Sequence, residues 1–241
     1  VSMMTVKHAK RKVSALLFKL QFESCIRDIQ KDASIVEKAC NELRQSTRLR
    51  RLLGIVLSFG NRLNTAGNGK RKAGAFTLDS LLKLKQAKAF DKKTTFLHYI
   101  VLITRRNHQD LVNFKDDIPT ACEGDKIFWD QCVADLEKVE NQLENVRKIA
   151  LYQAHQAQAY RLRRRPKKED PDESLTDDED NLTLEEEVET LRATPIGLFT
   201  LSAIKYVSAL RGKIETTKAM FAHLLEYFGE EDSALQPHEL F

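Results

Sequence analysis

The 241-residue sequence is poor in the residues that make tight turns, and it has no long hydrophobic run. Glycine and proline number only 9 and 5, too few for the many turns of an all-β fold. No apolar stretch approaches the about 18 residues that a membrane-spanning helix needs. Residues 1–12 show no signal-peptide pattern. We therefore expect neither an all-β fold nor a membrane span.

Cysteine is also scarce. The four cysteines, Cys25, Cys40, Cys122 and Cys132, form no C-x-x-C pair, and no histidine stands at zinc-finger spacing from them. We interpret them as reduced, buried thiols of a cytosolic protein.

Catalytic and cofactor motifs are missing too. The six histidines are scattered, with no H-E-x-x-H pattern, and no paired carboxylates stand in an apolar setting. Residues 67–70 read G-N-G-K but lack the spacing and the Ser/Thr of a phosphate-binding loop. We expect no enzyme activity, no cofactor and no metal site.

The sequence is rich in patterns typical of helices. Apolar residues make up 42% and charged residues 31%, as in helices with one buried stripe. A helix is predicted over 13–45, with an inner face of Phe18, Phe22, Cys25 and Ile29. Ser34 and Glu37 form a capping-box pattern, which predicts that a new helix starts at Ser34.

Shorter helices are predicted next. An apolar helix covers 48–63, and glycines predict a loop over 65–75. Asp79 is predicted to cap a helix that runs through Leu84, and another helix covers 92–114.

Two later runs have apolar residues three and four positions apart over about three heptads, which predicts long helices with coiled-coil-like seams. The first run is Trp129, Cys132, Leu136, Val139, Leu143 and Val146. The second run is Val207, Leu210, Ile214, Thr217, Phe221, Leu224 and Phe228.

Between these runs the composition changes. A basic stretch at 161–168 is followed by an acidic one, which predicts a disordered insertion over 161–182. The basic stretch is either a nuclear-localisation, phospholipid or nucleic-acid patch, or a solvated tether that neutralises the acidic run. Thr183 and Glu186 form a capping box for a further helix, which residues 194–197 interrupt.

Residues 60–98 carry a family signature. Residues 60–64 read G-N-R-L-N, and a glycine-rich loop leads to A-G-A-F at 73–76. A leucine- and lysine-rich helix and T-F-L-H-Y at 95–99 follow. This order resembles the formin homology two domain, the actin-assembly module of formins. Residues 16–22, 39–44 and 226–230 are also similar to that family, and Arg62 with the A-x-A-F form is most like its plant-type variants.

The resemblance implies an all-α, elongated helical domain. A globular helical post at 46–120 would be carried on a coiled-coil-like stalk formed by 1–45, 123–160 and 183–230. In the family, an N-terminal lasso of one subunit wraps the post of its partner and makes a closed homodimer. By this resemblance, we expect the chain to begin after the lasso, the linker and most of the next region, the knob. We therefore expect that dimer for the complete domain and not for this chain alone.

The resemblance also implies a function. The chain is expected to bind the fast-growing (barbed) ends of actin filaments and to nucleate or regulate assembly, in the cytoplasm at the cytoskeleton. Profilin-actin would be supplied through regions outside this chain. The alternative is a non-catalytic coiled-coil scaffold that retains the fold but lacks actin assembly activity. Nucleic-acid binding is not expected, because no stacking or groove-reading element is found.

Two sets of site residues follow from the resemblance. Lys88 matches a family lysine important for actin contact, and the supporting basic field is Lys83, Lys85, Lys92 and Arg71. The alternative for these lysines is a solvated helix face. The post pocket that receives a lasso aromatic is expected to include Gly60, Asn61, Asn64, Leu63 and Phe76. Taken alone, Gly60, Asn61 and Asn64 indicate only that a helix ends there.

Overall fold

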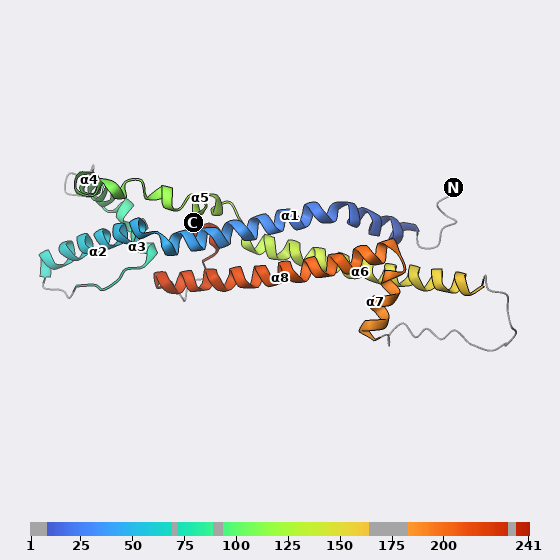
Figure 1. The fold of residues 1–241 in the computed structure, drawn as a ribbon. Coiled ribbons are helices and arrows are strands. Elements are labelled where there is room, and N and C mark those ends of the chain that lie inside the picture. The colour runs from blue at the N-terminus through green and yellow to red at the C-terminus, as the bar shows by residue number, and fades with distance from the viewer. Residues whose placement is uncertain (1–8, 69–71, 89–93, 164–182, 231–234) are drawn as a thin grey trace. The chain divides into compact units, whose positions relative to one another are not determined.

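The computed structural model describes residues 9–68, 72–88, 94–163, 183–230 and 235–241. Every regular element in these ranges is helical (Figure 1). The α-helices are α1 Ala9–Gln45, α2 Thr47–Asn68, α3 Leu78–Gln86, α4 Phe96–Asn107, α5 Ala121–Gly124, α6 Trp129–Arg163, α7 Leu184–Arg192, α8 Pro195–Phe228 and α9 Pro237–Leu240. Two 3₁₀ helices, η2 Gln109–Leu111 and η3 Phe114–Asp117, follow α4. The predicted all-α fold is confirmed for these ranges.

The chain divides into two compact units. The first unit contains Val1–Gln30 and Val133–Lys213, and the second contains Lys31–Cys132 and Ile214–Phe241. The long helices α1, α6 and α8 contribute residues to both units.

Aromatic packing and ion pairs hold the first unit together. The ring of Phe199 on α8 meets Phe18 and Phe22 of α1 edge-on, at centroid distances of 6.3 and 5.3 Å. Such edge-to-face pairs add about 0.5–1.5 kcal/mol to the burial of the rings. Arg211 of α8 pairs with Glu140 of α6 through two hydrogen bonds. Apolar burial and these polar links therefore hold α8 against both α1 and α6.

The second unit has its own apolar cluster. Ala39, Ile118 and Ala121 form its buried centre, and Leu43, Phe114 and Phe241 pack around it. The Phe241 ring also lies edge-on to Phe221 of α8, with centroids 6.0 Å apart. Residues from α1, α8 and the segment after α4 thus share one core.

The two predicted seams are confirmed in their positions. All six seam residues of α6 are buried, and so are the α8 seam residues from Val207 to Leu224, whereas Phe228 is only half-buried. Thr217 is a polar member of the α8 seam and is 1% exposed.

The predicted break at Ser34 is wrong, because α1 is continuous from Ala9 to Gln45. A helix start requires a change of backbone direction, but the buried positions keep the same three- and four-residue spacing through this region. These positions are Ile26, Ile29, Ala33, Val36 and Cys40. Packing along this unbroken stripe overrides the local capping pattern.

The expectation of four buried thiols is wrong for Cys25 and Cys122, which are exposed, whereas Cys40 and Cys132 are buried. Ile26 takes the inner position that the sequence interpretation gave to Cys25. A difference of one residue turns a helical side chain by about 100°, which is enough to move it off the packed face.

Several helix ends also differ from the predictions. Helix α2 continues through Gly60 to Asn68, so Gly60 and Asn61 do not end it. Thr77, and not Asp79, is the N-cap residue of α3, which ends at Gln86. The helix predicted over 92–114 begins only at Phe96, after the N-cap residue Thr95, and ends at Asn107; a short 3₁₀ helix, Gln109–Leu111, follows it. At α2 and α3, helical backbone hydrogen bonding continues past the glycine and begins before the aspartate that marked the predicted ends.

The corner between α7 and α8 is as predicted. Thr183 and Glu186 form a reciprocal capping box at the start of α7. Helix α7 ends at Arg192, and α8 begins at Pro195 with the Thr194 hydroxyl accepting from the Gly197 amide at 3.1 Å. The predicted insertion at 161–182 lies outside the described residues, apart from the end of α6 at Arg163.

Candidate functional site

Lys88 stands between α3 and α4 in a backbone arrangement that fixes its position. The amide of Ala87 donates to the carbonyl of Lys83 at 2.9 Å and ends α3, and the Phe96 amide donates to the carbonyl of Ala87 at 3.0 Å. Lys88 and Thr95 then form an isolated antiparallel bridge. The side chain of Lys88 is exposed. The side chain of Lys88 therefore extends into solvent from a backbone that the bonds of Ala87 and the bridge to Thr95 hold in place.

Thr95 completes this arrangement by starting α4. Its hydroxyl accepts from the His98 amide at 3.3 Å, and the His98 ring nitrogen lies 2.8 Å from the same hydroxyl. The histidine of the T-F-L-H-Y stretch therefore serves as a helix cap. Helix capping therefore explains the three-residue spacing of Thr95 and His98, and no catalytic role is needed to account for it.

The other predicted actin-contact residues are described in part. Lys83 is exposed on α3, and Lys85 lies in the same helix. Lys92 and Arg71 lie outside the described residues. Lys83 is therefore exposed on α3, and Lys88 is exposed two residues after the end of this helix.

Asn61 joins α2 to the segment that precedes α3. Its side-chain amide donates to the carbonyl of Ala73 at 2.8 Å, and the Ala73 amide donates back to the side-chain oxygen at 2.7 Å. An asparagine can make this double contact because it carries one donor group and one acceptor group. The predicted pocket asparagine thus positions the segment that carries Phe76.

Of the remaining pocket residues, three lie on an accessible part of α2 and one lies in the segment before α3. A methyl group added at Gly60 would meet nothing within 4 Å, and Leu63 is 43% exposed. Asn64 is exposed and Phe76 is half-buried. Gly60, Leu63 and Asn64 are three and four positions apart and so share one face of α2, and Phe76 belongs to the segment that Asn61 bonds to this helix.

A larger apolar surface on α4 escaped the sequence interpretation. Phe59 of α2 packs against Phe96 and Tyr99 of α4, with ring centroids 6.1 and 5.2 Å apart. Several large side chains of α4 nevertheless remain exposed, namely Leu97, Tyr99, Val101 and Leu102. The sequence held a signal for this, because 96–103 is apolar on nearly every side and one packed face covers only part of such a helix.

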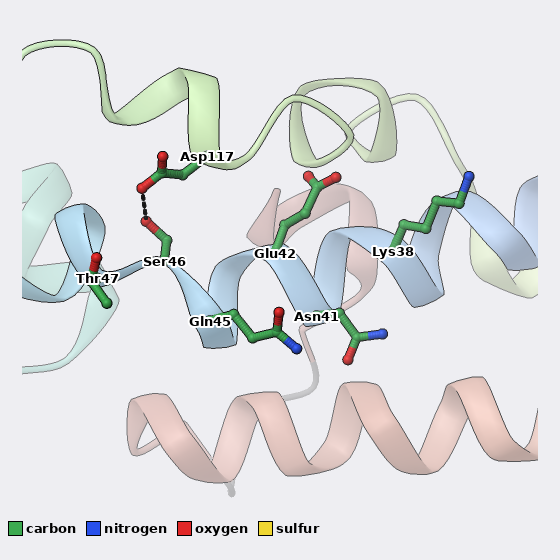
Figure 2. A pocket seen from close by; sticks show the side chains of 7 residues that line it. All are labelled: Lys38, Asn41, Glu42, Gln45, Ser46, Thr47 and Asp117. Atoms are coloured by element: carbon green, nitrogen blue, oxygen red, sulfur yellow. Dashed lines mark hydrogen bonds between the residues drawn. The ribbon is translucent and has the colours of Figure 1, made fainter.

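A polar pocket of about 420 Å³ lies at the elbow between α1 and α2 (Figure 2). Figure 2 shows Ser46 and Asp117 pointing toward each other, and the Ser46 hydroxyl donates to the Asp117 carboxylate at 3.1 Å. Ser46 also caps α2 by accepting from the Leu49 amide at 3.0 Å. The Asp117 carboxylate, which lines the pocket, is therefore already hydrogen-bonded to the residue that joins α1 and α2.

Further contacts fasten α1 and α2 to the segment after α4. Glu42 accepts from both the amide and the hydroxyl of Thr120, at 2.8 and 2.6 Å. Arg48 pairs with Asp117 at 3.3 Å, and Arg51 pairs with Asp110 at 2.5 Å. These links hold the start of α2 against the segment after α4. Leu63 and Asn64, toward the other end of α2, stay exposed.

Within the described ranges, no group of three or more histidine, cysteine or acidic residues could hold a metal ion. The same part of the chain contains no helix long and apolar enough to cross a membrane.

The fold and the site together define a helical interaction module. It has long helices packed along apolar seams, and an accessible surface beside the asparagine clamp, the pair of hydrogen bonds between Asn61 and Ala73. The chain belongs to the formin homology 2 domain family, whose model matches residues 1–241. Domains of this family are the actin-assembly modules of formins.

Relatives come from animals, amoebae and plants. The chain is 37% identical to human protein diaphanous homolog 3 over 61% of its length, and 26% identical to Dictyostelium discoideum formin-E over 97%. It is 30% identical to Arabidopsis thaliana formin-like protein 18 over 61% of its length. These matches cover only 12%, 13% and 13% of the three relatives.

Proposed function

We propose that this chain binds the barbed ends of actin filaments and nucleates or regulates filament assembly. Its membership of the formin homology 2 family supports this function. The exposed Lys88, held between α3 and α4, is the observation that carries it.

In this proposal the basic residues contact actin, whose surface is acidic. Lys88 makes the direct contact, and Lys83, Lys85, Lys92 and Arg71 add to the positive field. Complementary charge speeds encounter and orients the partners, and its effect weakens as salt rises.

We further propose that residues 46–120 act as the post. Gly60, Asn61, Leu63, Asn64 and Phe76 would receive an aromatic side chain of a lasso segment. The open space at Gly60 and the exposure of Leu63 support an apolar ligand at this place. The exposed side chains of α4 would extend the contact area.

The proposed mechanism is mechanical and involves no catalysis by this chain. A dimer of complete domains would hold two actin subunits in filament-like orientation and stabilise a nucleus that otherwise forms rarely. It would then step as subunits add, with profilin-actin supplied through regions outside this chain. Actin itself would hydrolyse ATP. We place this activity at the actin cytoskeleton in the cytoplasm.

Seeded actin elongation tests the proposal. Filament growth at barbed ends is measured against concentration of the chain, for the wild type, for Lys88→Asp and for Lys115→Asp. Lys115 is a matched control because it is an exposed lysine of the same unit, on η3. We expect dose-dependent slowing that Lys88→Asp weakens and Lys115→Asp leaves unchanged.

The second candidate is a coiled-coil scaffold that retains the fold without actin assembly activity. The buried seams of α6 and α8 favour it, because they account for the long helices without reference to actin. No effect on elongation from a fully helical protein would favour the scaffold. Equal weakening by both lysine substitutions would contradict a specific role for Lys88.

A further inference from the structure

Arg50, near the start of α2, contacts Tyr227, near the end of α8. The Nε of Arg50 donates to the Tyr227 hydroxyl at 3.0 Å, and its guanidinium lies 6.0 Å from the centre of the tyrosine ring. Another nitrogen of the same guanidinium donates to the carbonyl of Arg44 at 3.2 Å. Two hydrogen bonds therefore hold the cation beside the phenol oxygen.

Nothing acidic neutralises this cation in the described part of the chain. The neighbouring arginines are paired, Arg48 with Asp117 and Arg51 with Asp110. Among described residues, no carboxylate lies within ion-pair distance of Arg50, which donates its hydrogen bonds to two uncharged oxygens. A fixed positive charge thus faces a neutral hydroxyl.

We propose that Tyr227 is a phosphorylation site and that Arg50 receives the phosphate. A tyrosine kinase would transfer the γ-phosphoryl group of ATP to the phenol oxygen. The new O–P bond forms as the bond from the γ-phosphorus to ADP breaks, and the hydroxyl proton is released. The product carries a charge of about −1.5 to −2. A guanidinium is well suited to such a group because its planar fork can donate two parallel hydrogen bonds.

The position of Tyr227 suits modification. Its side chain is 46% exposed, and α8 ends one residue later at Phe228. Gly229 follows with φ of 73°, the left-handed conformation typical of a helix end. Terminal helical turns open more readily than interior ones, which would give a kinase access. Glu226 and Glu230 place acidic residues on both sides of the tyrosine in sequence.

Phosphorylation would strengthen the link between α2 and α8. The present contact is a hydrogen bond to a neutral hydroxyl, and the product would be an ion pair with charge-assisted hydrogen bonds. Because α2 also carries Gly60, Asn61 and Leu63, the modification would steady the helix that bears the candidate pocket. The inference rests on the contact itself and is independent of actin binding.

The test begins with a tyrosine kinase chosen because it phosphorylates a synthetic peptide of residues 222–232. The whole chain is treated with this kinase and ATP, and the phosphates are located by peptide mass spectrometry. Thermal unfolding and amide exchange at the end of α8 are then compared before and after treatment. The same measurements are made on Arg50→Gln, Arg50→Lys and Tyr227→Phe.

We expect phosphate at Tyr227, a rise in the unfolding midpoint of about 2–4 °C, and slower exchange in the last turn of α8. Arg50→Gln is expected to abolish both stabilising effects, Arg50→Lys to retain part of them, and Tyr227→Phe to remove the modification. Tyr206 is the control, because it lies on the same helix and is 65% exposed. Phosphate at Tyr206 should give no shift that depends on Arg50.

Two results would overturn the inference. One is an unmodified Tyr227 in the whole chain under conditions that modify the peptide. The other is a phosphorylated Tyr227 whose midpoint and exchange rates are the same in the wild type and in Arg50→Gln.

Discussion

The side chain of Asn61 and the peptide group of Ala73 are joined by two hydrogen bonds, one in each direction. This pair fixes the segment before α3 on the surface of α2, so the family signature has a structural role before any partner binds. An exposed amide network of this kind is weaker than a buried one, because water competes for the same groups.

Asn61→Ala is expected to release this segment. The loss of two hydrogen bonds should cost about 1–2 kcal/mol and should speed hydrogen exchange at the Ala73 amide. Asn61→Asp keeps the acceptor and loses the donor, so its effect should be intermediate. Asn64→Ala is the control, since Asn64 is exposed on the next turn of α2. Equal exchange rates in Asn61→Ala and Asn64→Ala would contradict the clamp.

Gly197→Ala is expected to destabilise the first unit. An added Cβ would lie only 1.9 Å from the carbonyl oxygen of Leu191, which belongs to the backbone and cannot turn aside. The α7–α8 corner would have to open, at a cost of about 3 kcal/mol or more. Urea unfolding followed by circular dichroism measures this loss.

Gly212→Ala is the matched control on the same helix. A Cβ at Gly212 meets nothing within 4 Å, and alanine favours helix over glycine by about 1 kcal/mol. We therefore expect Gly212→Ala to be neutral or stabilising. If both substitutions destabilised the protein equally, the close approach at Gly197 would not be the cause.

The contact between α6 and α7 should weaken in acid. Arg147 donates two hydrogen bonds of 2.5 Å to the Glu187 carboxylate, and the pKa of Glu187 is lowered mainly by this hydrogen bonding. The folded-state pKa therefore lies below the unfolded one. The stabilisation is present above the unfolded pKa of about 4.3 and is lost as pH falls through the folded pKa.

Amide exchange in α7, compared at pH 7 and at pH 3.5, measures this effect. We expect a loss of protection worth about 1 kcal/mol in the wild type. Glu187→Gln should have lower protection at pH 7 and little further loss in acid from this pair. An identical acid response in Glu187→Gln and wild type would assign the effect to other groups.

The four cysteines should react in two classes. Burial raises the pKa of the Cys40 thiol to about 12, and Cys132 is buried as well. Since the thiolate is the reactive form, brief alkylation at pH 8 should modify Cys25 and Cys122 and spare the other two. Mass spectrometry of the digested protein locates the modified residues, and unfolding in denaturant should make all four reactive. Fast modification of Cys40 in the folded protein would contradict its burial.

Features that a few neighbouring residues encode could be predicted without the fold. The seams of α6 and α8 follow from apolar spacing, and the Thr183 cap and the turn at 194–197 follow from side chains that bond to nearby backbone. The family followed from an ordered series of short motifs over 60–98.

Where two local signals compete, packing against other segments selects the one that prevails. Ser34 has a capping pattern, yet packing along the whole inner face of α1 keeps the helix unbroken. Gly60 and Asn61 have the composition of a helix end, but α2 continues, and the asparagine bonds instead to Ala73, twelve residues away. The same holds for the exposure of Cys25 and for the contact of Arg50 with Tyr227. Each depends on where a distant segment packs, and local spacing does not contain that information.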